Sequence, residues 1–532
     1  MLQPKGLIIG TIVLLGAMTL ADAPFMSRNL GRQESAVPRI DLDQSLLAKL
    51  REGMQAASSP SRTFAPWPPV GARAAPLEPE IVANTAPPLA GDMTFSTLIS
   101  KAILTSPHHF GPHPGEPPYR TFEFAARAEE NAELGIDGSL VHGSFSGHRL
   151  TILQLGDSHT AADFFTGRVR ERLQELYGAG GAGYIVPGVP HPGVRSALFK
   201  DEASDGWNYE ALQKSSENRR FYLSGFNAVA HHAGAVINLT ARDPIGYDSL
   251  KVAFLKQPGG GHAQVLIDGA LSGEIDLDGA GDQRAILSAR APGGGQHAIR
   301  EIAVRSTTDA PVTVTGVHVE RDGDGVSYLS LGFPGATMEV LQRLAMPNLS
   351  DDLRRLAPDI LVLAFGTNEG FNDNLDLGVY AADYERLIGK LKFLLPNAHI
   401  VLIGPPDGAR LPGAAHPCSG GATGHDCGET LPRTDAAAGA RCRFETPPKL
   451  AQVREAQRAT ATRTGAAFWD WSAIMPGPCG AQTWAAATPA LMAHDYVHMT
   501  LDGYKLSADK FADFLIPLID DRQSLKHVVS YN

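Results

Sequence analysis

Four short segments of the sequence carry the residue types that acyl-transfer chemistry uses. They are Gly156-Asp157-Ser158, the glycine turn at Gly335, Gly366-Thr367-Asn368 and Asp495-x-x-His498. A serine hydroxyl becomes a good nucleophile when a nearby base, most often histidine, takes its proton. Backbone N–H groups and a neutral side-chain amide can stabilise the negative charge that develops on an attacked ester carbonyl. Together the four segments predict attack by a serine on an ester.

The first three segments each follow a predicted strand of an α/β domain. Short apolar runs predict strands, apolar residues at helical spacing predict the helices between them, and this alternation indicates a parallel sheet covered on both faces. Because the carboxyl ends of parallel strands meet at one edge, we expect the serine, the glycine turn and the asparagine to lie close together there. The predicted strands are 150–155, 328–333, 359–365, 399–404 and 466–471, and the predicted helices are 163–177, 338–344, 380–395, 450–464 and 501–519.

The stretch between the serine and the second predicted strand has a different texture. Short β-favouring runs such as AVINLTA and VTVTGVHVE alternate there with glycine turns. This pattern is typical of an antiparallel β-sandwich. We therefore predict one α/β domain in two pieces, 149–205 and 326–525, interrupted by an all-β insert at 206–325.

The N-terminal region predicts export. Lys5 precedes an apolar run from Leu7 to Ala21, which is the pattern of a secretory signal and is short for a membrane span of about 20 residues. Residues 1–23 are thus expected to be a signal peptide or an uncleaved inner-membrane anchor. Either would place the rest of the chain in the periplasm or outside the cell. Residues 24–148 are rich in Pro, Ala and Ser and predict a mostly unstructured arm.

Cysteine usage and net charge also bear on location and partners. The four cysteines fit an oxidising compartment and predict two disulfides, for which Cys418–Cys427 with Cys442–Cys479 is the most local of three pairings. They include no CxxC pair, which makes zinc the weaker interpretation. The formal net charge of −11 argues against a dedicated nucleic-acid binder.

The four chemical segments, in this order, resemble the SGNH (GDSL-type) esterase superfamily. The resemblance implies a three-layer sandwich with a central parallel sheet. It also implies that Ser158 is the nucleophile, that His498 is the general base and then acid, and that Asp495 orients His498. The implied oxyanion hole consists of the backbone N–H groups of Ser158 and Gly335 and the side-chain amide of Asn368.

Several neighbouring residues allow more than one interpretation. Asp157 and His159 are expected to contact and position the catalytic residues, and His159 could instead line the pocket. Asp157 and Ser158 could also simply cap the following helix. His159 replaces the usual leucine of the motif. Glu369 replaces the more common aspartate, a change from which we expect no consequence. His494 and His498 are four positions apart and could bind zinc, but no Glu lies between them as in HExxH; we predict no metal and no cofactor.

The β insert resembles that of the periplasmic peptidoglycan O-acetylesterase group, in which the insert is similar to a carbohydrate-binding module. This resemblance implies an acetylated polysaccharide of the cell envelope or an exported polysaccharide as substrate. Two alternatives stay open: a polysaccharide O-acetyltransferase with the same triad, and an accessory binding or assembly protein of an exopolysaccharide system such as cellulose synthesis. Four tryptophans could stack on sugar rings or simply fill the core: Trp207, Trp469, Trp471 and Trp484.

Overall fold

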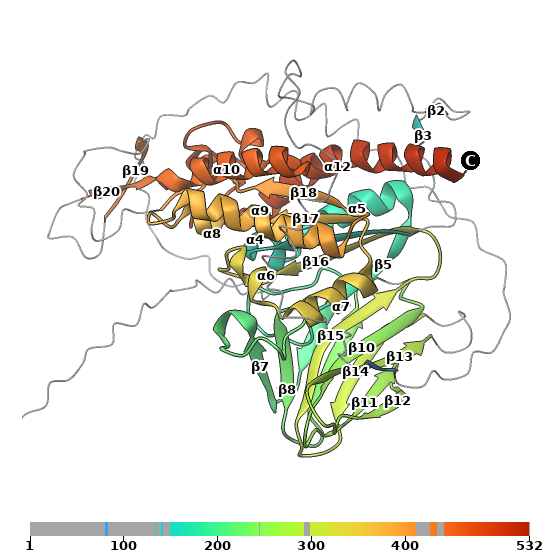
Figure 1. Cartoon of the computed structure of the whole chain (residues 1–532). Helices are drawn as coiled ribbons and strands as arrows, with labels where there is room; N and C mark the ends of the chain where they lie inside the picture. Colours follow the sequence, from blue (N-terminus) through green and yellow to red (C-terminus); the bar gives the residue numbers. More distant parts are fainter. Residues whose placement is uncertain are drawn as a thin grey trace, which may run out of the picture. The chain divides into compact units, whose positions relative to one another are not determined.

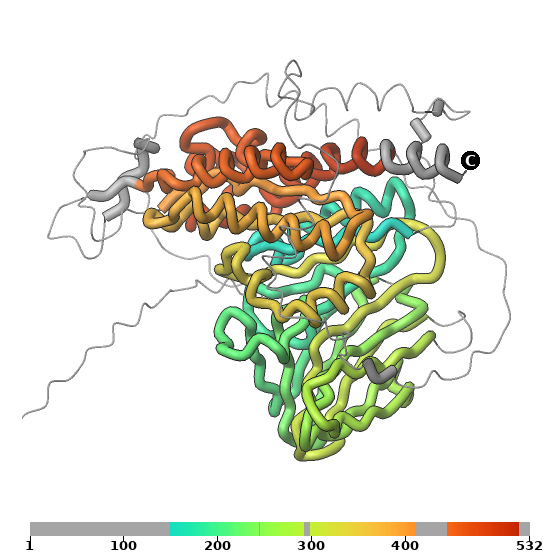
Figure 2. The backbone as a smooth tube through the Cα atoms, viewed as in Figure 1, coloured from blue at the N-terminus to red at the C-terminus, as the bar shows by residue number. Residues whose placement is uncertain are grey.

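The structure is a computed structural model that describes residues 149–410 and 441–530, apart from 244 and 292–297, together with four short strands. These strands are β1 (Glu80–Val82), β2 (Glu133–Leu134), β3 (Leu140–Val141) and β19 (Asp426–Pro432). Figure 2 shows the backbone path of the split α/β domain and the β-rich part in colour. The predicted leader at 1–23 and most of the arm at 24–148 lie outside the described residues. No helix among the described residues is long and apolar enough to cross a membrane.

A six-stranded parallel sheet forms the centre of the α/β part (Figure 1). From one edge to the other the order is β5 (Ala179–Ile185), β16 (Gly325–Gly332), β4 (Arg149–Gly156), β17 (Ile360–Ala364), β18 (His399–Gly404) and β21 (Ala467–Asp470). The strands at its centre, such as β17 and β18, are almost continuously buried, which explains why their sequences read as apolar runs.

Helices cover both faces of this sheet, as the alternation of side chains along β17 shows. Ile360 and Val362 share a core with residues of α5 (Phe164–Tyr177) and α12 (Leu501–Ser530). Leu361 and Leu363 share the opposite core with the helices of the other layer. Those helices are α6 (Glu339–Arg343), α7 (Met346–Leu356), α9 (Leu377–Leu394) and α10 (Pro448–Thr464). The predicted three-layer α/β fold is confirmed.

The segment between β5 and β16 is built from antiparallel strands in two sheets. One sheet has the order β12-β11-β14-β9-β6, and β13, β10, β15, β8 and β7 face it across a shared apolar core. The strands are β6 (Phe199–Ala203), β7 (Trp207–Ala211), β8 (Phe226–Ala230), β9 (Val236–Ala241), β10 (Ser249–Lys256), β11 (His262–Ile267), β12 (Ala270–Asp276), β13 (Gln283–Arg290), β14 (Glu301–Ser306) and β15 (Val312–Glu320). A sandwich of this kind was predicted from the glycine-punctuated strands.

One sheet runs through both parts of the molecule. Strand β5 pairs in parallel with β16 on one side and antiparallel with β15 on the other, so the parallel sheet and one sandwich sheet are continuous. Strand β6 precedes the predicted insert at 206–325 but pairs with β9 of the five-stranded sheet. The predicted boundaries at 205/206 and 325/326 stay predictions, and hydrogen bonding crosses both of them.

The C-terminal cysteines lie close to the edge of what the structure describes. Cys479 is disulfide-bonded and precedes α11 (Gly480–Ala486). The side chains of Cys418, Cys427 and Cys442 lie outside the described ones, so the pairing stays a prediction. Strand β19 pairs with β20 (Arg441–Glu445) as an antiparallel hairpin in the same region.

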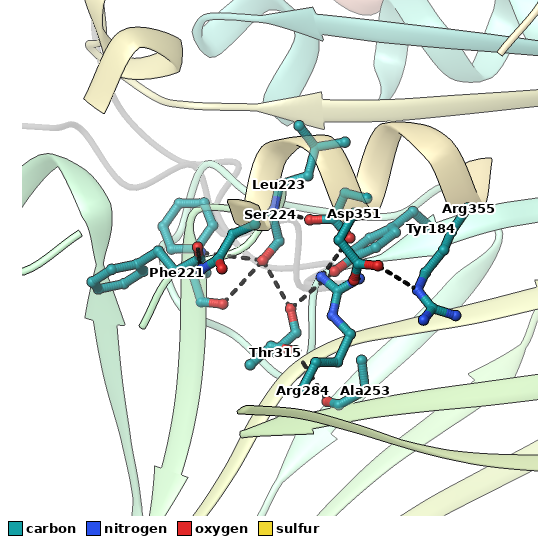
Figure 3. A network of polar contacts seen from close by, with 12 residues as sticks. Tyr184, Phe221, Leu223, Ser224, Ala253, Arg284, Thr315, Asp351 and Arg355 are labelled. Atoms are coloured by element: carbon teal, nitrogen blue, oxygen red, sulfur yellow. Dashed lines mark hydrogen bonds and ion pairs between the residues drawn. The ribbon is translucent and has the colours of Figure 1, made fainter. Parts of the chain in front are cut away.

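A buried ionic network ties the sandwich to the helical layer (Figure 3). The guanidinium of Arg284, from β13, binds the carboxylates of Asp351 and Asp352 of α7. It also lies 3.8 Å from the centre of the Tyr222 ring. The other oxygen of Asp352 accepts the backbone N–H of Leu223 at 2.6 Å. The network therefore fixes segment 221–224 between α7 and the sandwich.

Replacing Arg284 with methionine is expected to lower the free energy of unfolding by about 3–5 kcal/mol, because it leaves the buried Asp352 charge without its cation. Burial already raises the pKa of Asp352. The measurement is chemical denaturation at neutral pH. Arg355→Met is the matched control, since Arg355 binds the same Asp351 at a far more exposed position and should cost less than about 1 kcal/mol. Equal losses in the two variants would contradict the role of the network.

Candidate active site

The three sequence segments that follow β4, β16 and β17 begin at one point on the edge of the sheet. Gly156 of β4 pairs with Gly332 of β16 on one side and with Ala364 of β17 on the other. Glycine is needed at both ends because a Cβ on Gly156 would lie 2.2 Å from the Thr160 hydroxyl, and one on Gly332 would lie 2.2 Å from the nitrogen of Ala161. The tight packing brings the start of α4 (Ser158–Ala161) against both neighbouring strands.

Ser158, His498 and Asp495 form a continuous hydrogen-bonded chain. The Nε2 atom of His498 lies 2.9 Å from the Oγ atom of Ser158, and Nδ1 of His498 lies 2.7 Å from Oδ2 of Asp495. The other carboxylate oxygen of Asp495 accepts the backbone N–H groups of Val497 and His498, so its own turn fixes the carboxylate. The structure thus brings together residues 340 positions apart in the chain.

Electrostatics favour an ionised Asp495 beside a basic His498. Partial burial raises the pKa of Asp495, but the hydrogen bond from His498 and those from the backbone outweigh it and lower the pKa to about 2. Burial lowers the pKa of His498, but the hydrogen bond to Asp495 and its charge raise the pKa overall. An ionised Asp495 holds the proton of neutral His498 on Nδ1 and leaves Nε2 free to accept the proton of Ser158. Both ring nitrogens are then used within the hydrogen-bonded chain.

The groups predicted as oxyanion donors lie on the two loops beside Ser158. Gly335 has φ +74, a left-handed conformation that glycine adopts without strain. The Nδ2 atom of Asn368, in α8 (Thr367–Gly370), donates to the carbonyl of Ala336 at 2.8 Å, which leaves its second hydrogen for another acceptor. No hydrogen bond within the described residues uses the backbone N–H of Ser158 or Gly335. The arrangement can therefore offer three donors to an anionic oxygen.

Asp157 and His159 lie beneath these groups. The carboxylate of Asp157 caps α4 by accepting the His159 N–H at 3.0 Å, and burial raises its pKa to about 6. Capping of the helix and presentation of Ser158 are thus compatible. The buried His159 ring lies 5.3 Å from the ring of His498, and its Nδ1 contacts the Tyr504 hydroxyl at 3.0 Å. Burial lowers the pKa of His159 to about 3, so its ring is neutral.

Glu369 has a positioning role that the sequence did not reveal. We expected no consequence of its replacing aspartate, but it is buried and one of its oxygens accepts the backbone N–H of Met338 at 2.8 Å. Burial raises its pKa to about 7. Together with Asn368, it ties the loop that carries Gly335 to the loop after β17. The only sequence signal for this role was that Glu369 is an acidic residue directly after Asn368, and this position does not show that its side chain is buried.

The four tryptophans all fill the core and are not placed to stack on a sugar. Each is at least nine-tenths buried. Trp469 and Trp471 pack on each other and on Phe165 beneath the parallel sheet. Core packing, the second of the two interpretations, is therefore the correct one.

The fold and the arrangement of these residues are similar to those of GDSL (SGNH) esterases. The model of the "GDSL-like Lipase/Acylhydrolase family" matches residues 303–506, so the chain carries a domain of that family and is a hydrolase of ester bonds. The matched range contains Gly335, Asn368, Asp495 and His498 and begins after Ser158.

Two solved structures are similar to the chain, and the first of them shows the same fold. A peptidoglycan O-acetylesterase matches with a TM-score of 0.54 and 24% identity, over 78% of this chain and 99% of that chain. A family two carbohydrate esterase from Cellvibrio japonicus matches with a TM-score of 0.24 and 14% identity, over 60% of this chain and 99% of that chain. No curated protein matches the sequence.

Proposed function

We propose that the protein is an exported serine esterase that removes O-acetyl groups from a polysaccharide of the cell envelope or the extracellular space. The observation that carries the proposal is the hydrogen-bonded chain from Ser158 through His498 to Asp495 at the carboxyl edge of the sheet. The likeness to a peptidoglycan O-acetylesterase extends over nearly all of that chain, which supports an acetylated glycan as substrate. The apolar run from Leu7 to Ala21 supports export.

The geometry supports a two-step mechanism. His498 takes the proton of Ser158 while the serine oxygen attacks the acetyl carbonyl, and the carbonyl oxygen becomes an anion that accepts hydrogen bonds from Ser158, Gly335 and Asn368. When the tetrahedral intermediate collapses, the ester bond breaks and His498 gives its proton to the departing sugar oxygen. Water, deprotonated by His498, then attacks the acetyl-serine, and acetate leaves as Ser158 regains its proton.

The test is acetate release by the purified full chain. O-acetylated peptidoglycan, acetylated xylan and small acetyl esters serve as substrates, and Ser158→Ala serves as the inactive control. Release from any glycan by the wild type alone would support the proposal. If the wild type releases no more acetate than the variant from any ester, the proposal fails. Acetyl transfer to an added oligosaccharide would instead support the acetyltransferase, and binding without either reaction would support the accessory role.

Replacing Asn368 with alanine is expected to lower kcat on a small acetyl ester by about 10²–10³-fold with little change in KM. The reason is that the amide would act on the anionic oxygen of the transition state more strongly than on the ester carbonyl. Steady-state kinetics with 4-nitrophenyl acetate measures the effect. Asn374→Ala, at an exposed position in the loop after α8, is the control and should retain its activity. An unchanged kcat in Asn368→Ala would exclude the amide from the oxyanion hole.

A further inference from the structure

A cavity of about 290 Å³ adjoins the candidate oxyanion hole. Gly335 is part of its wall, whereas Ser158 and His498 are not. The rest of the lining comes from Phe226 and from residues within three segments, 190–191, 211–214 and 334–343. Residues 190–191 lie between β5 and β6, Ala211 ends β7 and Phe226 begins β8, whereas the third segment includes α6. Residues from both parts of the chain therefore form one concave surface beside Gly335.

The lining of this cavity carries more positive than negative charge. Lys214 and Arg343 are its cations, and Glu339 is its one carboxylate. The guanidinium of Arg343 donates to the backbone carbonyls of Gln213 and Ser215, which fix its orientation without neutralising its charge. Within the described residues, neither Lys214 nor Arg343 forms an ion pair. Both charges are thus available to an anion.

A third donor comes from His191. Its Nδ1 accepts the backbone N–H of Gly193 at 2.9 Å, which leaves the proton of the neutral ring on Nε2. Burial and the neighbouring Lys214 charge lower the pKa of His191, so the ring is neutral at neutral pH and can donate from Nε2. The lining therefore combines an ammonium, a guanidinium with a fixed orientation and a neutral N–H. These are the donors that recognise a carboxylate.

We propose that this cavity binds a carboxylate that the substrate carries close to the acylated hydroxyl. The proposal rests on the esterase function proposed above and names its substrate class, an acidic acetylated glycan. An ester bound with its carbonyl oxygen at Gly335 would present the adjoining part of the sugar to the cavity. The volume is at the small end of ligand sites, which suits one substituted sugar ring rather than a longer segment of polymer. The net charge of the whole chain is negative and would not attract an anion from a distance. The positive charges of Lys214 and Arg343 would therefore act on the carboxylate only at short range.

The test compares two acetylated sugars that differ only in a carboxylate or the corresponding carboxamide. We expect wild-type kcat/KM to be about fivefold higher for the carboxylate, in line with one or two exposed charge pairs. Lys214→Gln should remove most of this preference and leave the hydrolysis of 4-nitrophenyl acetate unchanged. The matched control is Lys251→Gln, which removes an exposed lysine from β10 and should keep the preference.

Two further arms sharpen the experiment. Arg343→Lys keeps the positive charge but loses the guanidinium that donates to the carbonyls of Gln213 and Ser215. Because this loss could change stability, the thermal unfolding of the variant is measured together with its kinetics. Two series of substrates are used, with the carboxylate either directly on the sugar ring or on an ether substituent of the ring. In either series, a preference for the carboxylate over the carboxamide that is lost in Lys214→Gln supports the proposal. Equal rates on the carboxylate and the carboxamide in both series would overturn it.

The experiment distinguishes failure of the proposed esterase function from failure of the proposed carboxylate site. A wild type that hydrolyses no ester refutes the esterase, and calorimetry with the deacetylated carboxylate sugar then tests the cavity alone. Binding that Lys214→Gln weakens about fivefold, and Lys251→Gln does not, would support the anion site. Absence of binding by the wild type would overturn it.

Discussion

Replacing Ser158 with alanine is expected to lower kcat/KM on acetyl esters by about 10⁶-fold, down to the rate that the oxyanion donors and substrate binding alone can supply. The variant has no side-chain oxygen at residue 158 for His498 to activate. The fold should be unaffected, because α4 is capped by the Asp157 carboxylate and not by Ser158. We expect the free energy of unfolding to change by less than about 1 kcal/mol.

Two measurements make this result specific to Ser158. A fluorophosphonate that reacts with activated serines should add one mass increment to the wild type and none to Ser158→Ala. Ser216→Ala, which removes an exposed hydroxyl from the loop after β7, should retain both activity and labelling. A Ser158→Ala rate within tenfold of the wild type would refute the nucleophile.

The parallel sheet could be predicted from sequence where strands are largely apolar, but β5 could not. Strand β5 reads AGGAGYI, and its small residues carry no β signal because they are selected for close packing. A Cβ on Gly181 would lie 2.9 Å from the Cα atom of Glu320. Its pairing with β15 joins segments about 130 positions apart, and no local pattern encodes that contact. The sequence therefore did not predict that the parallel sheet and one sandwich sheet are continuous through β5.

The hydrogen-bonded residues of the site could be predicted because their types are rare in combination and each follows or precedes a recognisable element. Glu369 and the cavity could not, because their roles depend on burial and long-range contact. Glu369 contacts Met338, and Arg343 contacts Gln213, which is 130 positions away. A lone lysine such as Lys214 in an exposed turn has no distinguishing sequence context. Chemistry at strand ends is thus local in the sequence, whereas the groups that position and select a substrate are not.

Replacing Asp495 with asparagine is expected to lower kcat by about 10⁴-fold. The amide of asparagine would donate to Nδ1 of His498 and move the ring proton to Nε2, where it blocks transfer from Ser158.

The carboxylate of Asp495 also controls the pH dependence of kcat/KM. His498 must be neutral to act as a base, so wild-type kcat/KM should rise with pH and reach half its plateau at the pKa of His498. Because Asp495 raises that pKa, the midpoint should lie above the ordinary value of 6.5.

The sign of the shift in the variant separates this role from simple damage to the site. Without the Asp495 charge the pKa of His498 falls, so the residual activity of Asp495→Asn should reach half its plateau at a lower pH than the wild type. The other nearby carboxylate that raises the pKa of His498 is Asp157, which is present in both proteins, so the difference between the two midpoints measures the loss of the Asp495 carboxylate. Asp502→Asn, at an exposed position in the first turn of α12, should keep both the rate and the midpoint. A wild-type midpoint at or below 6.5, or an unchanged midpoint in Asp495→Asn, would show that the pair is not coupled in the way its 2.7 Å contact indicates.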